Sequence, residues 1–442
     1  MNVDAIDHYR EEFHQNRDSL TADRFSETRK TAMKELEENG FPTRRQENWK
    51  YTDIRPVIRT PFSLPEDKQG SVAPDYLDEC RPEGLECHEL VFINGIYNRD
   101  ISSTGDLTGG MVLDSLENAG VDYAGLVDRH LARYADTKNN PFVALNTAFL
   151  KQGAFIYIPR DLRVEKPVHL LFITSDGAKA QVSYPRILVI MEENSDATII
   201  EQYNGTGENH YFTNSVTEIC LLDGSRLEHC KIQQENSDSY HIGNLHVAQH
   251  GKSHFLSHSF TLGGSITRND IHAELRDEGA EILLNGLYIA TGSQHMDNHT
   301  RVDHLFPRTC SREYYRGVVN DHARAVFNGK VVVHKDAQKT DALQSNANLL
   351  LADTAEVDTK PELEIYADDV KCSHGATVGQ LDDDMLFYLR SRAIDKKTAR
   401  NMLTSAFTEE IINRIPFPEL HSYIGRQVQQ KLPDADHERN KG

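Results

Sequence analysis

A cysteine and a histidine stand two residues apart near the end of the chain, at Cys372 and His374. Residues of a β-strand alternate between its two faces, so residues i and i+2 share a face. If this segment is extended, the thiol and the imidazole point the same way, and such a pair suits soft metal ions or sulfur species. Taken alone, the pair fits equally well a half-buried strand end whose histidine is hydrogen-bonded to the backbone.

Histidine is plentiful, and five of the 21 histidines fall within one short segment. On a helix, a spacing of four residues would align such side chains into a metal-binding face. Gly243 and Gly251 interrupt the segment and apolar residues alternate around His246, which indicates strands. We therefore expect these histidines to point mostly outward as solvated surface, and a weak metal site is the less favoured interpretation. They are His241, His246, His250, His254 and His258.

Two further motifs are incomplete. His295 and His299 have the spacing of a zinc metalloprotease helix, but Met296 stands where the catalytic glutamate belongs. We expect His299 and His304 to structure a turn or to line an interface. The sequence also contains no Walker A motif, which argues against ATP binding by the chain itself.

Composition limits the classes of partner. The net charge of the 442 residues is −20, from 48 basic and 68 acidic side chains. Non-specific binding to nucleic acid or to an anionic membrane needs a basic surface, so protein partners are favoured. We identify no signal peptide and no apolar run long enough to span a membrane, and we expect a cytoplasmic protein. The six cysteines are too scattered for a disulfide framework.

Three regions follow from the hydrophobic patterns. Residues 1–150 are expected to form an N-terminal helical region with a linker, in which residues 61–88 carry the Pro, Gly and acidic residues of a loop. Residues 90–97 have the pattern of a strand with an Asn-Gly turn, and residues 112–150 that of helices. From residue 151 onward, short apolar runs alternate with polar turns.

A repeated element organises residues 151–379. It consists of a turn, a small residue, a polar residue and an apolar residue, and its last positions are 28, 28, 27, 43 and 32 residues apart. A nearly constant period of short strands predicts a stacked β-solenoid, and the regularity counts against a β-sandwich. The last positions are Ile199, Leu227, Phe255, Ile282, Ala325 and Val357.

Residues 380–442 return to a helical pattern. Apolar residues share one face of residues 381–392, with acidic residues near the expected helix start, where they suit the helix dipole. A second helix is expected over residues 395–413. The polar segment 433–442 is expected to be a disordered tail.

Longer strings carry a resemblance. The Cys372–His374 pair lies within Glu364-Ile-Tyr-Ala-Asp-Asp-Val-Lys-Cys-Ser-His-Gly-Ala-Thr-Val-Gly379. This string resembles the SufB/SufD family of iron–sulfur cluster assembly scaffolds, and the Trp-Lys-Tyr-Thr run near the N-terminus favours the SufD branch. The similarity runs from about residue 40 to 415 and is densest over 286–392. The matching runs are residues 46–53, 297–304, 311–317, 323–330, 338–341, 360–380 and 386–392.

The resemblance implies a fold and a set of partners. The expected fold is mainly β: a right-handed parallel β-helix core over residues 151–379, with an N-terminal helical region and a C-terminal helical domain. Family members work as a complex of one SufB, one SufD and two SufC ATPases. SufB and SufD pair through their β-helices, and the C-terminal helices dock SufC, for which Leu403 and Phe407 are the candidate residues. Self-pairing of the β-helix would give a homodimer of the isolated chain.

The resemblance also implies a site. His374 matches the SufD histidine that is proposed to bind a transient iron–sulfur cluster at the SufB–SufD interface, and Cys372 matches the neighbouring cysteine. One imidazole and one thiol cannot supply four ligands, so SufB must complete the site. A flavin in the complex is a further cofactor associated with the family.

Two other classes of function compete with a non-enzymatic scaffold. A stand-alone metal-dependent enzyme would use the histidine-rich β-region, but the sequence offers no complete ligand set and no nucleophile–base pair. A carbohydrate-active β-helix would need exposed rows of aromatic residues, which the sequence lacks. We favour the scaffold because of the resemblance.

Overall fold

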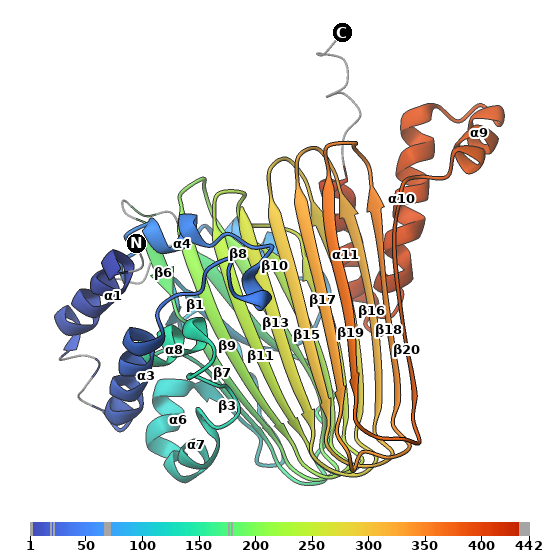
Figure 1. Cartoon of the computed structure of the whole chain (residues 1–442). Coiled ribbons are helices and arrows are strands. Elements are labelled where there is room, and N and C mark those ends of the chain that lie inside the picture. The colour runs from blue at the N-terminus through green and yellow to red at the C-terminus, as the bar shows by residue number, and fades with distance from the viewer. Residues whose placement is uncertain are drawn as a thin grey trace.

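Two long β-sheets face each other along most of the chain and form a flattened solenoid (Figure 1). The computed structural model describes residues 3–17, 20, 23–65, 72–175, 177 and 180–432, so the polar segment 433–442 lies outside the described residues. Each turn of the solenoid contributes one strand to each sheet. The predicted class, a mainly β protein with a β-helix core between two helical regions, is confirmed.

The first sheet, called here the β20 sheet, is parallel except for the β1–β2 hairpin. In spatial order its strands are β2 (Ile96–Tyr97), β1 (His88–Ile93), β5 (Val168–Thr174), β8 (Asp196–Gly205), β10 (Arg226–Gln234), β12 (His254–Thr261), β14 (Glu281–Ala290), β16 (Cys310–Val319), β18 (Asp341–Leu350) and β20 (Lys371–Gly379).

The second sheet, the β19 sheet, is parallel except for the β3–β4 pair. In spatial order its strands are β19 (Glu356–Ile365), β17 (Arg324–Val333), β15 (His295–His304), β13 (Ile266–Leu275), β11 (Tyr240–Gln249), β9 (Tyr211–Leu221), β7 (Arg186–Met191), β4 (Gly153–Ile158) and β3 (Val112–Ser115), and β6 (Gln181–Ser183) pairs with β9.

The strand register corrects part of the predicted repeat. Leu227, Phe255 and Ile282 stack in the β20 sheet, as the repeat predicts. The next stacked residue is Ser311, whereas Ala325 belongs to the β19 sheet. In each coil, the strand of either sheet follows a similar turn. The step of 43 residues arises because the repeated pattern passes from a strand of the β20 sheet to a strand of the β19 sheet.

Side chains that point into the solenoid form an apolar core with a polar band across it. Phe172, Ile219 and Phe255 are among the buried residues of that core. In the same interior, buried Glu201 accepts a hydrogen bond from Thr217, and buried Lys231 donates to Asn269. Stacked parallel strands bury both of their faces when helices cover the outside, so polar groups in this band must bond to one another.

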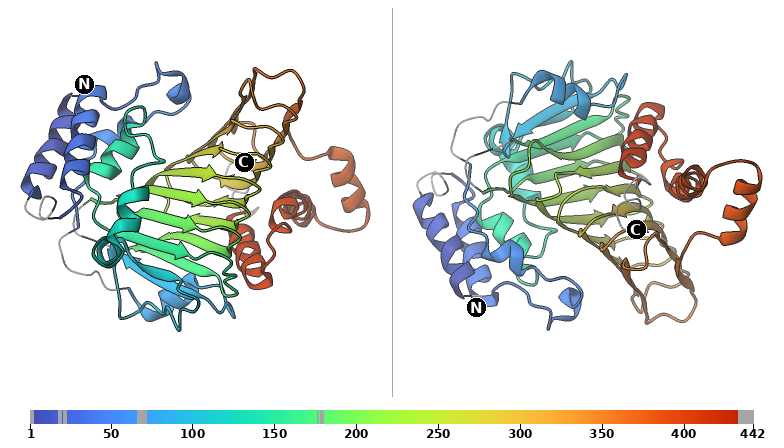
Figure 2. Two further views of the ribbon diagram at one scale, coloured as in Figure 1. Left: turned by 90° about the horizontal axis from the view of Figure 1, so that it is seen from below. Right: turned by 90° about the horizontal axis from the view of Figure 1, so that it is seen from above.

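Most of the N-terminal helices lie on the outer face of the β19 sheet, whereas the helix Pro74–Cys80 packs on β1 and β5 of the β20 sheet (Figures 1 and 2). Trp49 lies on the Arg268 guanidinium, 3.8 Å from the ring centre, and ties this region to β13. The helices of this region are α1 (Val3–Gln15), α3 (Ser26–Asn39), the short 3-10 helix η1 (Glu47–Trp49), α4 (Arg55–Arg59), α5 (Pro74–Cys80), α6 (Leu116–Asp122), α7 (Ala124–His130) and α8 (Pro141–Ala148).

Three helices follow β20: α9 (Asp383–Ser391), α10 (Lys396–Ile412) and α11 (Pro418–Lys431). The last two pack on the outer face of the β20 sheet, where Ile411 and Ile424 join a buried cluster with Phe260. Figure 2 shows α9 projecting away from the sheets. Sequence analysis predicts the first two of these helices and does not predict α11. None of the described helices is long and apolar enough to cross a membrane.

Candidate functional site

Cys372 and His374 lie on β20, the terminal strand of its sheet, which pairs on one side only, with β18. Cys372 is opposite Ala342 and His374 is opposite Gln344, and both β18 residues are buried inside the solenoid. The thiol and the imidazole therefore share the inward face of the last coil, which no further coil covers. Residues Lys371–Gly379 form a strand, as the predicted shared face of Cys372 and His374 requires.

The two side chains differ in burial. Cys372 is half-buried against the apolar cluster that contains Val331 and Ala342, whereas His374 is exposed. Burial raises the pKa of the Cys372 thiol, which keeps it protonated at neutral pH. Within the described part of the chain, the imidazole of His374 makes no hydrogen bond or ion pair, and no third Cys, His, Asp or Glu completes a metal site with this pair. The pair therefore consists of two possible donor groups, without a third, at an open end of the sheet.

The prediction that the five clustered histidines are solvated surface is wrong for three of them, and the other two, His250 and His254, are half-buried. His241, His246 and His258 are buried, because the solenoid interior covers one face of each strand and packed helices or segments cover the other. His241 bonds through Nδ1 to Glu235, and His258 lies 3.2 Å from Glu228. Burial lowers the pKa of His246 to about 4. These rings lie on different faces and sheets, and they form no common metal site.

The segment around His295 also has a structural role. His295 Nε2 lies 2.8 Å from Thr52 Oγ1, and His299 Nε2 lies 2.9 Å from an Asp297 carboxylate oxygen. His304 is buried beside the turn that follows β15, 2.7 Å from Thr309 Oγ1, as the turn role predicts. Each of these three imidazoles contacts a polar side chain of a different residue.

The exposed apolar surface of the C-terminal helices lies on α9 and the start of α10. Phe387 is 74% exposed, and Met385, Tyr388 and Met402 are also exposed. By contrast, Phe407 is half-buried in the cluster between α10 and the β20 sheet, 5.3 Å from the Arg316 guanidinium, and Leu403 is half-buried too. The two candidate docking residues are therefore less available to a partner than Phe387.

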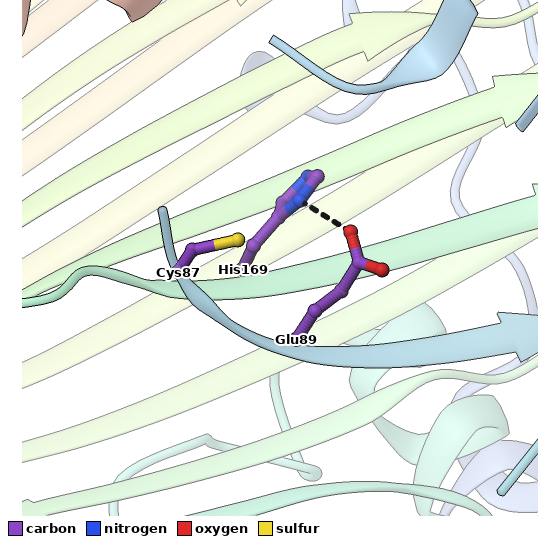
Figure 3. Close-up of side chains that lie close together, drawn as sticks. All are labelled: Cys87, Glu89 and His169. Atoms are coloured by element: carbon purple, nitrogen blue, oxygen red, sulfur yellow. Dashed lines mark hydrogen bonds and ion pairs between the residues drawn. The ribbon is translucent and has the colours of Figure 1, made fainter. Parts of the chain in front are cut away.

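One cluster was not predicted from the sequence. Cys87, Glu89 and His169 place a sulfur, a carboxylate oxygen and an imidazole nitrogen within 4.8 Å of one another, and they are the one such group of three in the described residues (Figure 3). Their only local signal is the Cys-x-Glu spacing at the start of β1. His169 is distant in sequence, and the pairing of β1 with β5 brings it to Glu89.

Comparison with known proteins places the chain in a family. The family model "SufBD protein N-terminal region" matches residues 3–170, and the model "SUF system FeS cluster assembly, SufBD core domain" matches residues 172–407. The chain belongs to the SufBD family. The core-domain match begins within β5 and ends within α10, so it contains β20 and the Cys372–His374 pair.

Individual SufBD relatives are similar over most of their length. An iron–sulfur cluster assembly SufBD family protein of Synechocystis sp. is 34% identical over 88% of this chain and 87% of its own. The iron–sulfur cluster assembly protein SufD of Escherichia coli is 33% identical over 91% of this chain and 92% of its own. SufD of Bacillus subtilis is 24% identical over 73% of this chain and 74% of its own. The protein is thus a SufBD-family iron–sulfur cluster assembly protein.

Proposed function

We propose that this chain is a non-enzymatic scaffold subunit that works with a SufB partner and the SufC ATPase. The observation that carries the proposal is the open coil end at β20, where Cys372 and His374 share a face without a third ligand. A nascent iron–sulfur cluster is the cargo of such a site. Thiolates usually hold these clusters and histidine is an occasional substitute, so a partner must supply the remaining ligands.

The end of the solenoid supports pairing with another β-sheet protein. β19 and β20 are the terminal strands of their sheets, so one edge of each carries unpaired backbone groups. Ile365, Tyr366 and Val378 are apolar and exposed at this end, with 42%, 62% and 46% of their surface accessible. Exposed apolar side chains beside free strand edges are typical of a protein–protein interface. We assign this end to SufB, or to a second copy of the chain when SufB is absent.

The α9 surface is the proposed SufC dock. Helix α9 contributes no buried residue to the described structure, and its Phe387 and Tyr388 face solvent. Exposed aromatic side chains on a projecting helix supply the anchors on which interfaces depend. An ATP-driven movement of SufC would then be transmitted to the cluster site through the segment that links β20 to α9.

The proposal is tested by replacing His374. The chain is co-expressed with SufB and SufC, and the purified complex is reconstituted anaerobically with iron and sulfide. We expect His374→Ala to assemble the complex but to carry little cluster, measured as bound iron, sulfide and visible absorption. His322→Ala, which removes an exposed histidine from a turn, is the matched control. Normal cluster loading of the His374→Ala complex would remove His374 from the site, and failure of any wild-type complex to form would refute the partners.

A further inference from the structure

The Cys87–Glu89–His169 cluster lies on the outer face of the β20 sheet, at the opposite end of the solenoid from β20. Cys87 and Glu89 are two residues apart in an extended segment, so their side chains share a face. Glu89 is directly opposite His169 in the β1–β5 register. Figure 3 shows the thiol, the carboxylate and the imidazole gathered at one place.

A buried amide fixes the orientation of the His169 ring. His169 Nε2 lies 3.1 Å from Gln202 Oε1. The Gln202 amide nitrogen donates to the Cys80 carbonyl at 2.8 Å and to the Tyr423 hydroxyl oxygen at 3.0 Å, so its oxygen must face the ring. Nε2 therefore carries a proton and donates it to Gln202. Metal-binding histidines typically have this arrangement, in which the second nitrogen donates to a fixed oxygen.

The remaining nitrogen faces the other two donors. His169 Nδ1 lies 3.0 Å from Glu89 Oε1, and Glu89 is only 4% exposed. Arg81 donates to both carboxylate oxygens, with Nη2 2.6 Å from Oε2 and Nε 3.2 Å from Oε1. With Nε2 donating to Gln202, Nδ1 and Oε1 lie close enough to share either a proton or a metal ion. The adjacent Cys87 thiol supplies a third, soft donor, which a metal ion can use and a proton does not need.

We propose that Cys87, Glu89 and His169 bind one divalent transition-metal ion, of the class of Fe²⁺ and Zn²⁺, through Sγ, Oε1 and Nδ1. Sulfur, nitrogen and oxygen donors together suit these borderline ions. Bonds from such an ion to these donors are about 2.0–2.3 Å long, and small side-chain rotations bring donors that lie within 4.8 Å onto one ion. Cys87 is half-buried, so solvent reaches the cluster on its side.

The ion would join three separate parts of the fold. Its ligands come from β1, the residue before β1, and β5. Arg81 follows α5, and Gln202 connects His169 to Tyr423 of α11. The proposal is independent of the Cys372–His374 pair, because none of these residues lies on β20. It adds a metal site that belongs to this chain alone and needs no partner subunit.

The test uses Co²⁺ as a spectroscopic probe on the purified full chain, reduced and freed of metal. A thiolate bound to Co²⁺ gives a charge-transfer absorption band, so the band reports a cysteine ligand directly. We expect one equivalent of Co²⁺ with this band in the wild type, and displacement by Zn²⁺ or Fe²⁺. Cys87→Ser should lose the band and bind at least about tenfold more weakly. Because Cys87 is half-buried at the end of a loop, this variant is expected to fold.

Two cysteine variants act as controls. Cys310→Ser changes another half-buried cysteine, and Cys372→Ser removes the thiol of the β20 pair. Both should keep the band. Metal should also raise the unfolding temperature of the wild type and of both controls but not of Cys87→Ser, since an ion that binds the native state stabilises it. A wild type that retains no Co²⁺, or a band that persists in Cys87→Ser and vanishes in Cys372→Ser, would overturn the proposal.

Discussion

Glu313 shows what a single residue experiences inside the solenoid. Its carboxyl group is fully buried, and it accepts hydrogen bonds from Thr300 Oγ1 at 2.6 Å and Gln344 Nε2 at 3.3 Å. Burial raises the pKa of Glu313 to about 7, since two neutral donors compensate only in part for lost hydration. Glu201, in the same interior band, differs: burial opposes its ionisation, but His229 and Lys231 outweigh this and lower its pKa to about 2.

We predict that Glu313→Gln stabilises the protein at pH 8. The folded pKa lies above the unfolded one, so the folded state binds more protons between about pH 4.5 and 7, and the free energy of unfolding falls as pH rises through that window. The shift corresponds to roughly 3 kcal/mol at 1.36 kcal/mol per unit. Thermal unfolding across pH 4.5–8 should show a smaller loss of stability in Glu313→Gln than in the wild type.

The control for this prediction is Glu165→Gln, which neutralises an exposed glutamate. It should follow the wild-type pH profile within about 0.5 kcal/mol. If Glu313→Gln and Glu165→Gln have the same profile, then Glu313 is ionised when buried, and its pKa has not been raised.

Helices α9 and α10 differ in how much aromatic surface they expose to a partner. Phe387 of α9 is 74% exposed, whereas Phe407 of α10 packs in the cluster with Ile411. We predict that Phe387→Asp changes the free energy of unfolding by less than about 0.5 kcal/mol but abolishes SufC co-purification. Phe407→Asp should cost about 3 kcal/mol, because it places a charge in an apolar cluster.

Urea unfolding and SufC pull-down on the same samples separate these effects. A Phe387→Asp chain that unfolds like the wild type and still binds SufC would show that the dock lies elsewhere. The pair also distinguishes a lost contact from a damaged helix, since only Phe407→Asp is expected to lower stability.

The sequence allows the elements to be predicted better than their pairing. Apolar periodicity identifies the solenoid and two C-terminal helices, and α11 was also visible in the helical spacing of Leu420, Tyr423 and Ile424. The assignment of strands to the two sheets was not visible. Each coil contains two similar turns, so a local pattern cannot distinguish Ser311 from Ala325 as the residue that stacks after Ile282.

The environments of individual side chains are likewise harder to predict from the sequence than the elements that carry them. Cys372 and His374 are two residues apart on one strand, so their shared face follows from alternation alone. His246 alternates with apolar residues as a surface residue would, yet packed segments cover its outward face. The partner of Glu89 is His169, and only the long-range register of β1 with β5 reveals it.

The molecule as a whole is a solenoid in which, among the described residues, no further strand covers the coil that ends with β19 and β20. The β20 end carries two terminal strands and exposed Tyr366 and Val378, while the first coils are wrapped by N-terminal helices (Figure 1). A solenoid normally needs a cap at each terminal coil, because exposed edges pair with other chains. The β20 end is therefore the proposed interface, for which we expect SufB and a second copy of the chain to compete.

We predict that Val378→Lys weakens both associations together. A lysine on an edge strand opposes pairing with another sheet, so the variant should shift the isolated chain toward monomer in analytical ultracentrifugation and reduce SufB capture about tenfold or more. Val121→Lys, which changes another exposed valine, on α6, is the control and should change neither. SufB added to a wild-type homodimer should dissociate it as the heteromer forms. A homodimer that binds SufB without dissociating would place the two interfaces on different surfaces, and His374 could then face only one of them.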